Sequence, residues 1–141
     1  METKKKKVLF LCTHNSARSQ IAEGLLRTLY GDRYEAFSAG AEPTTLNPYV
    51  VKVMLEIGID LSGHHSKSIN EFRKISFDYV VTVCDKAKDL ECPFYYGLKV
   101  DDVSFPDPSD FKGSDEDILC KVRDVRDEIK NYIIKTFGEQ K

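Results

Sequence analysis

The sequence predicts an α/β fold: a single three-layer domain with a central parallel sheet of about four strands and helices on both faces. Short apolar runs typical of buried strands alternate with longer segments of helical periodicity, and the connections between them are short. The chain has 141 residues, of which 41% are hydrophobic and 31% are charged. This is enough for one full hydrophobic core, so we expect one domain over residues 1–141.

The first half of the chain is expected to contain two strands and two helices. Its first apolar run has no polar residue, which is typical of a central strand that is covered on both faces. The second helix has the clearest start signal, an asparagine cap followed by proline. The expected elements are a strand at Val8–Leu11, a helix from about Ser19 to Tyr30 capped by Gly31, a strand at Tyr34–Ser38, and a helix that begins at Pro48 after Asn47 and ends at Gly58.

The second half is expected to end in a long helix. Ser114 and Asp117 form a capping-box pattern at its start, and apolar residues from Ile118 to Ile133 recur on one face. Cys120 lies within this helix, and we expect it to pack in the core. The expected elements before the helix are a short helical segment at 68–74 and strands at Tyr79–Val83 and Leu98–Val100.

The composition argues against several classes of function. A net charge of −2 disfavours nucleic acid or an anionic membrane as the main partner. The sequence has no apolar stretch long enough to span a bilayer and no secretory signal, so we expect a cytoplasmic protein. Thiols stay reduced in that compartment. The four cysteines are therefore expected to be catalytic, metal-binding or incidental rather than a disulfide framework.

Cys12 directly follows the first predicted strand, and Arg18 lies at the start of the helix expected from about Ser19. Such an arrangement gathers backbone N–H groups, the positive end of a helix and a guanidinium around one sulfur. These groups, together with the hydroxyl of Ser19, favour the thiolate, and Arg18 can hold two oxygens of phosphate or arsenate. Asn15 tolerates the left-handed backbone that a tight loop demands. A small buried cysteine that merely ends a strand is the alternative, but the pattern favours a nucleophile in an oxyanion-binding loop.

Asp107 lies between two prolines, in Phe105-Pro106-Asp107-Pro108, on a loop expected at the same edge of the sheet. The prolines restrict the backbone around the carboxyl group, which suits a general acid that protonates a leaving oxygen. Taken alone, the pattern is more typical of an ordinary turn. Beside a cysteine loop, the role of an acid is favoured.

Cys84 and Cys92 separate the possible functions. Cys84 ends another predicted strand at the same sheet edge as Cys12, and Cys92 follows after a polar stretch. If Cys84 reaches Cys12, the chain holds a three-thiol relay. Otherwise Cys84 is a buried strand-end residue and Cys92 a loop thiol. A zinc site with His64 or His65 is disfavoured because the Cys-x2-Cys spacing is absent, so we expect no metal and no cofactor.

The residues after the first strand show a family resemblance. The run Cys12-Thr13-His14-Asn15-Ser16-Ala17-Arg18-Ser19-Gln20-Ile21-Ala22-Glu23-Gly24 resembles the signature of thioredoxin-coupled arsenate reductases, which share the low-molecular-weight tyrosine phosphatase fold. The likeness covers nearly the whole chain. It continues through Ser38-Ala39-Gly40, Asn47-Pro48, Val81-Thr82-Val83-Cys84, Cys92-Pro93, Asp107-Pro108 and the segment 122–129.

The resemblance implies a reaction and the residues that perform it. Arsenate would bind in the loop, Cys12 would attack arsenic with the aid of Asp107, and Cys84 would attack Cys12 and release arsenite. Cys92 would then move the disulfide to the surface, where thioredoxin could reduce it. The implied catalytic residues are Cys12, Arg18, Ser19, Cys84, Cys92 and Asp107, and the implied oxyanion-binding residues are Cys12, Thr13, His14, Asn15, Ser16, Ala17 and Arg18.

The chain departs from the family pattern in one spacing, since Cys84 and Cys92 are one residue further apart than in the family pattern, and at three positions. His14 replaces a common glycine, and Ala17 replaces a common cysteine, which removes a possible wrong disulfide. Lys67 stands where members that bind a structural potassium ion have an acid. We expect the ammonium of Lys67 to take the place of that ion, near Asn15, Glu23 and Ser38.

Two other functions stay open. A low-molecular-weight protein-tyrosine phosphatase would use the same loop and Asp107 to hydrolyse phosphate monoesters through a phosphocysteine. Ser109-Asp110-Phe111 stands where such phosphatases usually carry tyrosines, which weakens a phosphotyrosine-stacking site. A non-catalytic redox sensor would form a disulfide between Cys84 and Cys92 without turning over arsenate.

Overall fold

The computed structural model describes residues 5–12, 15, 17–40, 44–72, 75–83, 99–103 and 105–138. Strands and helices alternate among them in the predicted order, with ends shifted by a few residues. None of the helices in this part of the chain is long and apolar enough to cross a membrane. The elements are β1 (Lys6–Cys12), α1 (Arg18–Tyr30), β2 (Tyr34–Gly40), α2 (Pro48–Leu55), the 3-10 helix η1 (Ile69–Phe72), β3 (Tyr79–Thr82), β4 (Lys99–Asp102), the 3-10 helix η4 (Pro108–Asp110), α3 (Asp115–Ile133) and the π-helical turn η5 (Ile134–Gly138).

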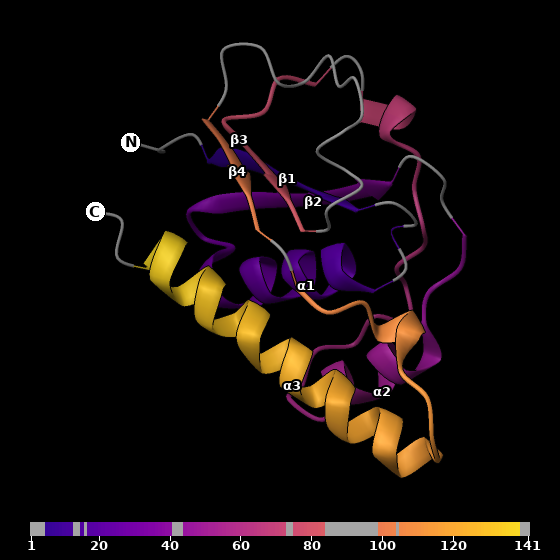
Figure 1. Ribbon diagram of the computed structural model, residues 1–141. Coiled ribbons are helices and arrows are strands. Elements are labelled where there is room, and N and C mark those ends of the chain that lie inside the picture. The colour runs from indigo at the N-terminus through magenta and orange to yellow at the C-terminus, as the bar shows by residue number, and fades with distance from the viewer. Residues whose placement is uncertain are drawn as a thin grey trace.

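The sheet is parallel throughout and has the strand order β2-β1-β3-β4 (Figure 1). β1 is an inner strand, and its residues Val8–Leu11 are at most 2% exposed because both faces are covered. Cys12 pairs with Gly40 of β2, and Leu11 pairs with Thr82 of β3. The carboxyl ends of these strands therefore meet at one edge, and Cys12 lies at that edge.

The helices predicted on both faces of the sheet are unevenly divided, because the three α-helices lie on one face and, among the described residues, only the short 3-10 helix η1 lies on the other (Figure 1). α1 contacts β1 and β2, and α3 packs against both α1 and α2. On this face Phe137 of η5 packs edge-on against Phe10 of β1. On the opposite face the rings of Phe37, Phe72 and Phe77 pack edge to face with one another. Apolar contacts thus enclose β1 from both sides and hold the end of the strand in place.

The helix boundaries confirm the predicted caps, with one difference at Gly31. The side chain of Asn47 accepts a hydrogen bond of 2.9 Å from a first-turn N–H of α2, and Ser114 and Asp117 form the capping box of α3. Gly31 follows α1 with a φ of −62°, which is not the left-handed region. A Cβ at this position would lie 2.3 Å from the carbonyl oxygen of Arg27. Glycine is needed here for a close approach of the backbone rather than for its positive φ.

Cys120 does not have the predicted packing role. The residue is exposed on α3, whereas Ile118 and Val122 on either side of it are buried. Position 120 lies about 200° round the helix from each of these two neighbours. A thiol at this position therefore points away from the core face of α3.

Candidate functional site

Cys12 ends β1 and is only 4% exposed. A short connection leads from Cys12 to Arg18, the first residue of α1. The sulfur therefore lies between the carboxyl end of an inner strand and the N-terminal end of a helix, where parallel α/β sheets bind anions. Asn15 is described within this connection, and the predicted loop residues that lie outside the described residues are Thr13, His14 and Ser16.

Asn15 adopts the left-handed conformation predicted for it. Its φ is 51°, and it is the one non-glycine residue with a positive φ in the described part of the chain. This backbone costs a residue other than glycine on the order of 1 kcal/mol, so it persists only where the surroundings hold it. Asn15 is fully buried, so neighbouring protein groups must stabilise this conformation.

Hydrogen bonds from four residues hold Asn15. Its Nδ2 donates to Oγ of Ser19 at 2.7 Å, and its Oδ1 accepts from the backbone N–H of Lys67 at 2.8 Å. Its carbonyl oxygen accepts from Oγ of Ser66 at 2.8 Å, and Nε2 of Gln20 donates to Oδ1 at 3.0 Å. The sequence analysis missed Gln20 and Ser66. The sequence near Gln20 holds no signal for this role, because only the contacts with distant residues explain why its polar side chain is fully buried.

Arg18 joins the start of α1 to the loop that contains Asp107. Nη1 of Arg18 donates to the carbonyl oxygen of Phe105 at 3.1 Å, and Nη2 lies 3.2 Å from Oδ2 of Asp107. Nε of Arg18 is buried and has no hydrogen-bond partner among the described residues. A buried guanidinium nitrogen of this kind fits an oxygen of a tetrahedral anion. The structure thus brings two predicted site residues, Arg18 and Asp107, into direct contact.

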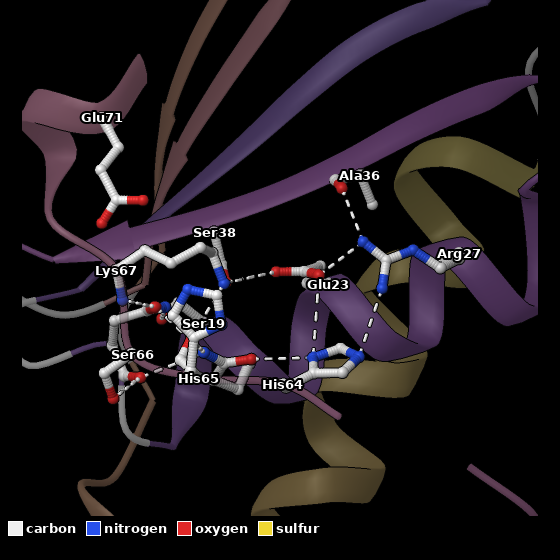
Figure 2. Close-up of polar contacts among 12 residues, drawn as sticks. Ser19, Glu23, Arg27, Ala36, Ser38, His64, His65, Ser66, Lys67 and Glu71 are labelled. Atoms are coloured by element: carbon white, nitrogen blue, oxygen red, sulfur yellow. Dashed lines mark hydrogen bonds and ion pairs between the residues drawn. The ribbon is translucent and has the colours of Figure 1, made fainter. Parts of the chain in front are cut away.

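A second cluster surrounds the buried carboxylate of Glu23, which is 4% exposed (Figure 2). Oγ of Ser38 donates to Oε1 of Glu23, and Nη2 of Arg27 lies 2.5 Å from Oε2. Nζ of Lys67 lies 3.6 Å from Oε1 and donates to the carbonyl oxygen of His65 at 3.0 Å. The ammonium therefore lies beside Glu23 as expected, whereas Lys67 contacts Asn15 through its backbone. In the described part of the chain no group of His, Cys, Asp and Glu residues could hold a metal ion.

The structure describes only some residues of the predicted site. Arg18 contacts Asp107, and Asn15 contacts Ser19, so these four residues form two pairs. Ala17 precedes α1 at the N-cap position and offers no side-chain cap, which leaves the first N–H groups of the helix to other acceptors. Two predicted catalytic thiols lie outside the described residues, Cys84 and Cys92.

Comparison with known proteins agrees with this geometry. A profile of the family described as low molecular weight phosphotyrosine protein phosphatase matches residues 7–140. The chain is 44% identical to an arsenate reductase of Halalkalibacterium halodurans over 136 residues, which is 96% of each chain.

Two solved structures extend the comparison. An arsenate reductase in the phosphate binding state is 31% identical, with a TM-score of 0.82 over 95% of this chain and 98% of that chain. A thioredoxin-dependent arsenate reductase of Corynebacterium glutamicum is 28% identical, with a TM-score of 0.66, over 96% of this chain and 65% of that chain. These matches confirm the predicted fold class and the resemblance. Since they extend over nearly its whole length, the chain belongs to the low molecular weight phosphotyrosine protein phosphatase family and, within it, to the arsenate reductases.

Proposed function

We propose that this protein reduces arsenate to arsenite, with Cys12 as the nucleophile and a relay of three thiols that thioredoxin recycles. The proposal rests above all on the contact between Arg18 and Asp107, 3.2 Å long, at the start of the helix that follows Cys12. This contact brings an anion-binding guanidinium and a carboxyl group together at the end of the short connection that begins at Cys12. The chain's relatives, which are arsenate reductases, indicate which anion is the substrate.

The first step would form a bond between sulfur and arsenic. Arsenate binds in the loop with its oxygens held by backbone N–H groups and by Nε of Arg18. The Cys12 thiolate attacks arsenic, an As–S bond forms, and one oxygen leaves as water. Asp107, which contacts Arg18, takes up a proton before this step and gives it to the leaving oxygen.

The second step would transfer the electrons. The Cys84 thiolate attacks the sulfur of Cys12, an S–S bond forms, and the electron pair of the As–S bond stays on arsenic. Arsenic thereby passes from the pentavalent to the trivalent state and leaves as arsenite, while two thiols become one disulfide. Phosphorus has no accessible trivalent state under these conditions, so bound phosphate would not be reduced.

The sheet register supports a role for Cys84. The N–H of Val83 donates to the carbonyl oxygen of Leu11 at 2.9 Å, which extends the pairing of β3 with β1. In the sequence, Cys12 follows Leu11 and Cys84 follows Val83. Because the carboxyl ends of neighbouring parallel strands meet at one edge of a sheet, this register supports an attack of Cys84 on Cys12.

The third step would return Cys12 to its reduced thiol form. Cys92 attacks Cys84, and the disulfide moves to Cys84 and Cys92, where a dithiol reductant such as thioredoxin opens it. The relative from C. glutamicum is a thioredoxin-dependent enzyme, which supports this choice of reductant. Because such reductants keep thiols reduced in the cytoplasm, we place the protein there.

The same site also suits phosphate ester hydrolysis, the activity that the family description names. Cys12 would then attack phosphorus, and Asp107 would protonate the leaving alcohol. We expect weak hydrolysis of small aryl phosphates as a side activity. It needs neither Cys84 nor Cys92, which makes it the control reaction for the relay.

The test is arsenate-dependent oxidation of NADPH with thioredoxin and thioredoxin reductase. The wild type should turn over, and Cys12→Ser, Cys84→Ser and Cys92→Ser should each abolish turnover. Hydrolysis of p-nitrophenyl phosphate should be lost only in Cys12→Ser. Cys120→Ser is the matched control, because that thiol is exposed on α3, and it should behave as wild type. A wild type that hydrolyses the aryl phosphate but does not consume NADPH would refute the proposal in favour of a phosphatase.

A further inference from the structure

A series of hydrogen bonds connects Asn15 to Gln20 and Gln20 to His64. Asn15 and His64 contact opposite sides of the Gln20 amide. Nε2 of Gln20 lies 3.0 Å from Oδ1 of Asn15 and 3.0 Å from the carbonyl oxygen of His65. On the other side of the same amide, Oε1 of Gln20 lies 3.0 Å from Nδ1 of His64. The second ring nitrogen of His64, Nε2, lies 3.3 Å from Nη1 of Arg27 (Figure 2). Two elements distant in sequence, α1 and the segment before η1, are joined in this way.

Backbone groups that can only donate or only accept hydrogen bonds determine how the side chains of Asn15, Gln20 and His64 are oriented. The backbone N–H of Lys67 only donates, so the atom of Asn15 that faces it is Oδ1. The carbonyl oxygen of His65 only accepts, so Gln20 turns Nε2 toward it and Oε1 toward His64. Nδ1 of His64 must therefore carry a proton.

The other ring nitrogen must be without a proton, because Nη1 of Arg27 only donates. His64 accordingly has the neutral form that is protonated at Nδ1 alone. In this form every contact of the ring pairs one donor with one acceptor.

We propose that His64, in this neutral form, is a positioning residue for the oxyanion loop. Its Nδ1–H fixes the amide of Gln20, and Gln20 in turn holds Asn15 in the left-handed conformation. His64 acts through Gln20 and not on the reacting atoms. The inference rests on the proposed role of the loop in binding an oxyanion.

The surroundings of His64 favour the neutral ring. The ring faces Glu23 and Arg27 of α1, Asp60 ahead of it in the chain and Lys67 after it. Burial lowers the pKa of His64, Arg27 and Lys67 lower it further, and together they outweigh the opposite effect of Glu23 and Asp60. A second proton, on Nε2, would point at the guanidinium of Arg27, so donor would face donor and like charges would meet.

Binding of inorganic phosphate to the reduced protein, measured by titration calorimetry at pH 7.5, tests the proposal. Asparagine and leucine have the same number of side-chain heavy atoms and the same branching, but only asparagine offers an N–H close to the position of Nδ1. We expect His64→Asn to bind phosphate within about twofold of wild type. We expect His64→Leu to bind about fivefold more weakly, since Gln20 loses a buried hydrogen bond. His65→Leu is the matched control and should bind as wild type, because His65 is exposed and contributes only its carbonyl oxygen to the network.

The outcomes separate this proposal from the function on which it rests. Equal phosphate affinity in His64→Leu and wild type, or equal weakening in His64→Asn and His64→Leu, would overturn the role of the Nδ1–H group. A wild type that binds no phosphate would overturn the oxyanion role of the loop itself. Nitrogen-15 NMR of the wild type gives a reading that needs no variant. We expect His64 to carry its proton on Nδ1 at pH 7.5, and a proton on Nε2 would refute the assignment.

Discussion

Replacing Arg18 by lysine should weaken oxyanion binding and leave the fold intact. Each nitrogen of the Arg18 guanidinium has a different environment. Nη1 donates to the carbonyl oxygen of Phe105 at 3.1 Å, Nη2 lies 3.2 Å from Asp107, and Nε is buried without a partner among the described residues. A lysine ammonium cannot keep both protein contacts and also present a donor in the direction of Nε.

The expected loss follows from the donor that Arg18→Lys removes. A hydrogen bond to a charged group contributes about 1.5–3 kcal/mol. At about 1.4 kcal/mol for each factor of ten, the variant should bind phosphate or arsenate about 10- to 100-fold more weakly. The free energy of unfolding in the absence of anion should change much less, because an ammonium can still pair with Asp107.

Titration calorimetry with inorganic phosphate measures this loss directly, and urea unfolding checks the fold. Arg123→Lys is the matched control. Arg123 also contacts a carboxylate, that of Glu56, but its side chain is 41% exposed and joins α3 to the residue that follows α2. This control should bind phosphate as wild type. If Arg18→Lys also bound phosphate within about threefold of wild type, the guanidinium would not be the anion-binding group, and the reasoning would be wrong.

Three further predictions concern the neighbours of the loop. Asp107→Asn should lower kcat for arsenate reduction and for aryl phosphate hydrolysis by about 100-fold with little change in phosphate affinity, since a general acid acts on the leaving group; unchanged kcat would contradict this. His64 should make the folded state less stable in acid. Its folded pKa is lowered from 6.5, so the unfolded chain takes up a proton that the folded one refuses, and the free energy of unfolding falls as the pH drops below about 6.5. Urea unfolding between pH 5 and 8 should show a smaller fall in His64→Asn. Finally, activity should be the same in potassium and sodium chloride of equal ionic strength, because Lys67 lies 3.6 Å from Oε1 of Glu23; strong activation by potassium would argue against this.

Much of the fold could be predicted because the signals are local. The apolar run of β1, the asparagine and proline at the start of α2, and the capping box of α3 each lie within a few neighbouring residues. The carboxyl end of an inner strand followed by a helix also places Cys12 and Arg18 from sequence alone. Arg18 and Asp107 are far apart in the chain. The sequence therefore predicted both as site residues but did not predict that they contact each other.

The errors and omissions also have physical reasons. Gln20 was not singled out as a site residue, yet its polar side chain is fully buried, and Asn15 and His64 satisfy its amide on both sides. Such a residue cannot be recognised before its partners are placed. Cys120 was expected to pack because it lies within the final helix, although its place on the helix relative to Ile118 already put it on the outer face.

The most direct test of the relay is a single turnover with Cys92→Ser. The fully reduced variant is mixed with one equivalent of arsenate without thioredoxin, and thiols, arsenite and disulfides are then measured. The mechanism predicts that two thiols are lost for each arsenite released, and that peptide mapping finds a disulfide between Cys12 and Cys84. If arsenate leaves all thiols intact and no arsenite appears, while the same sample still hydrolyses p-nitrophenyl phosphate, the site is that of a phosphatase and the relay does not exist.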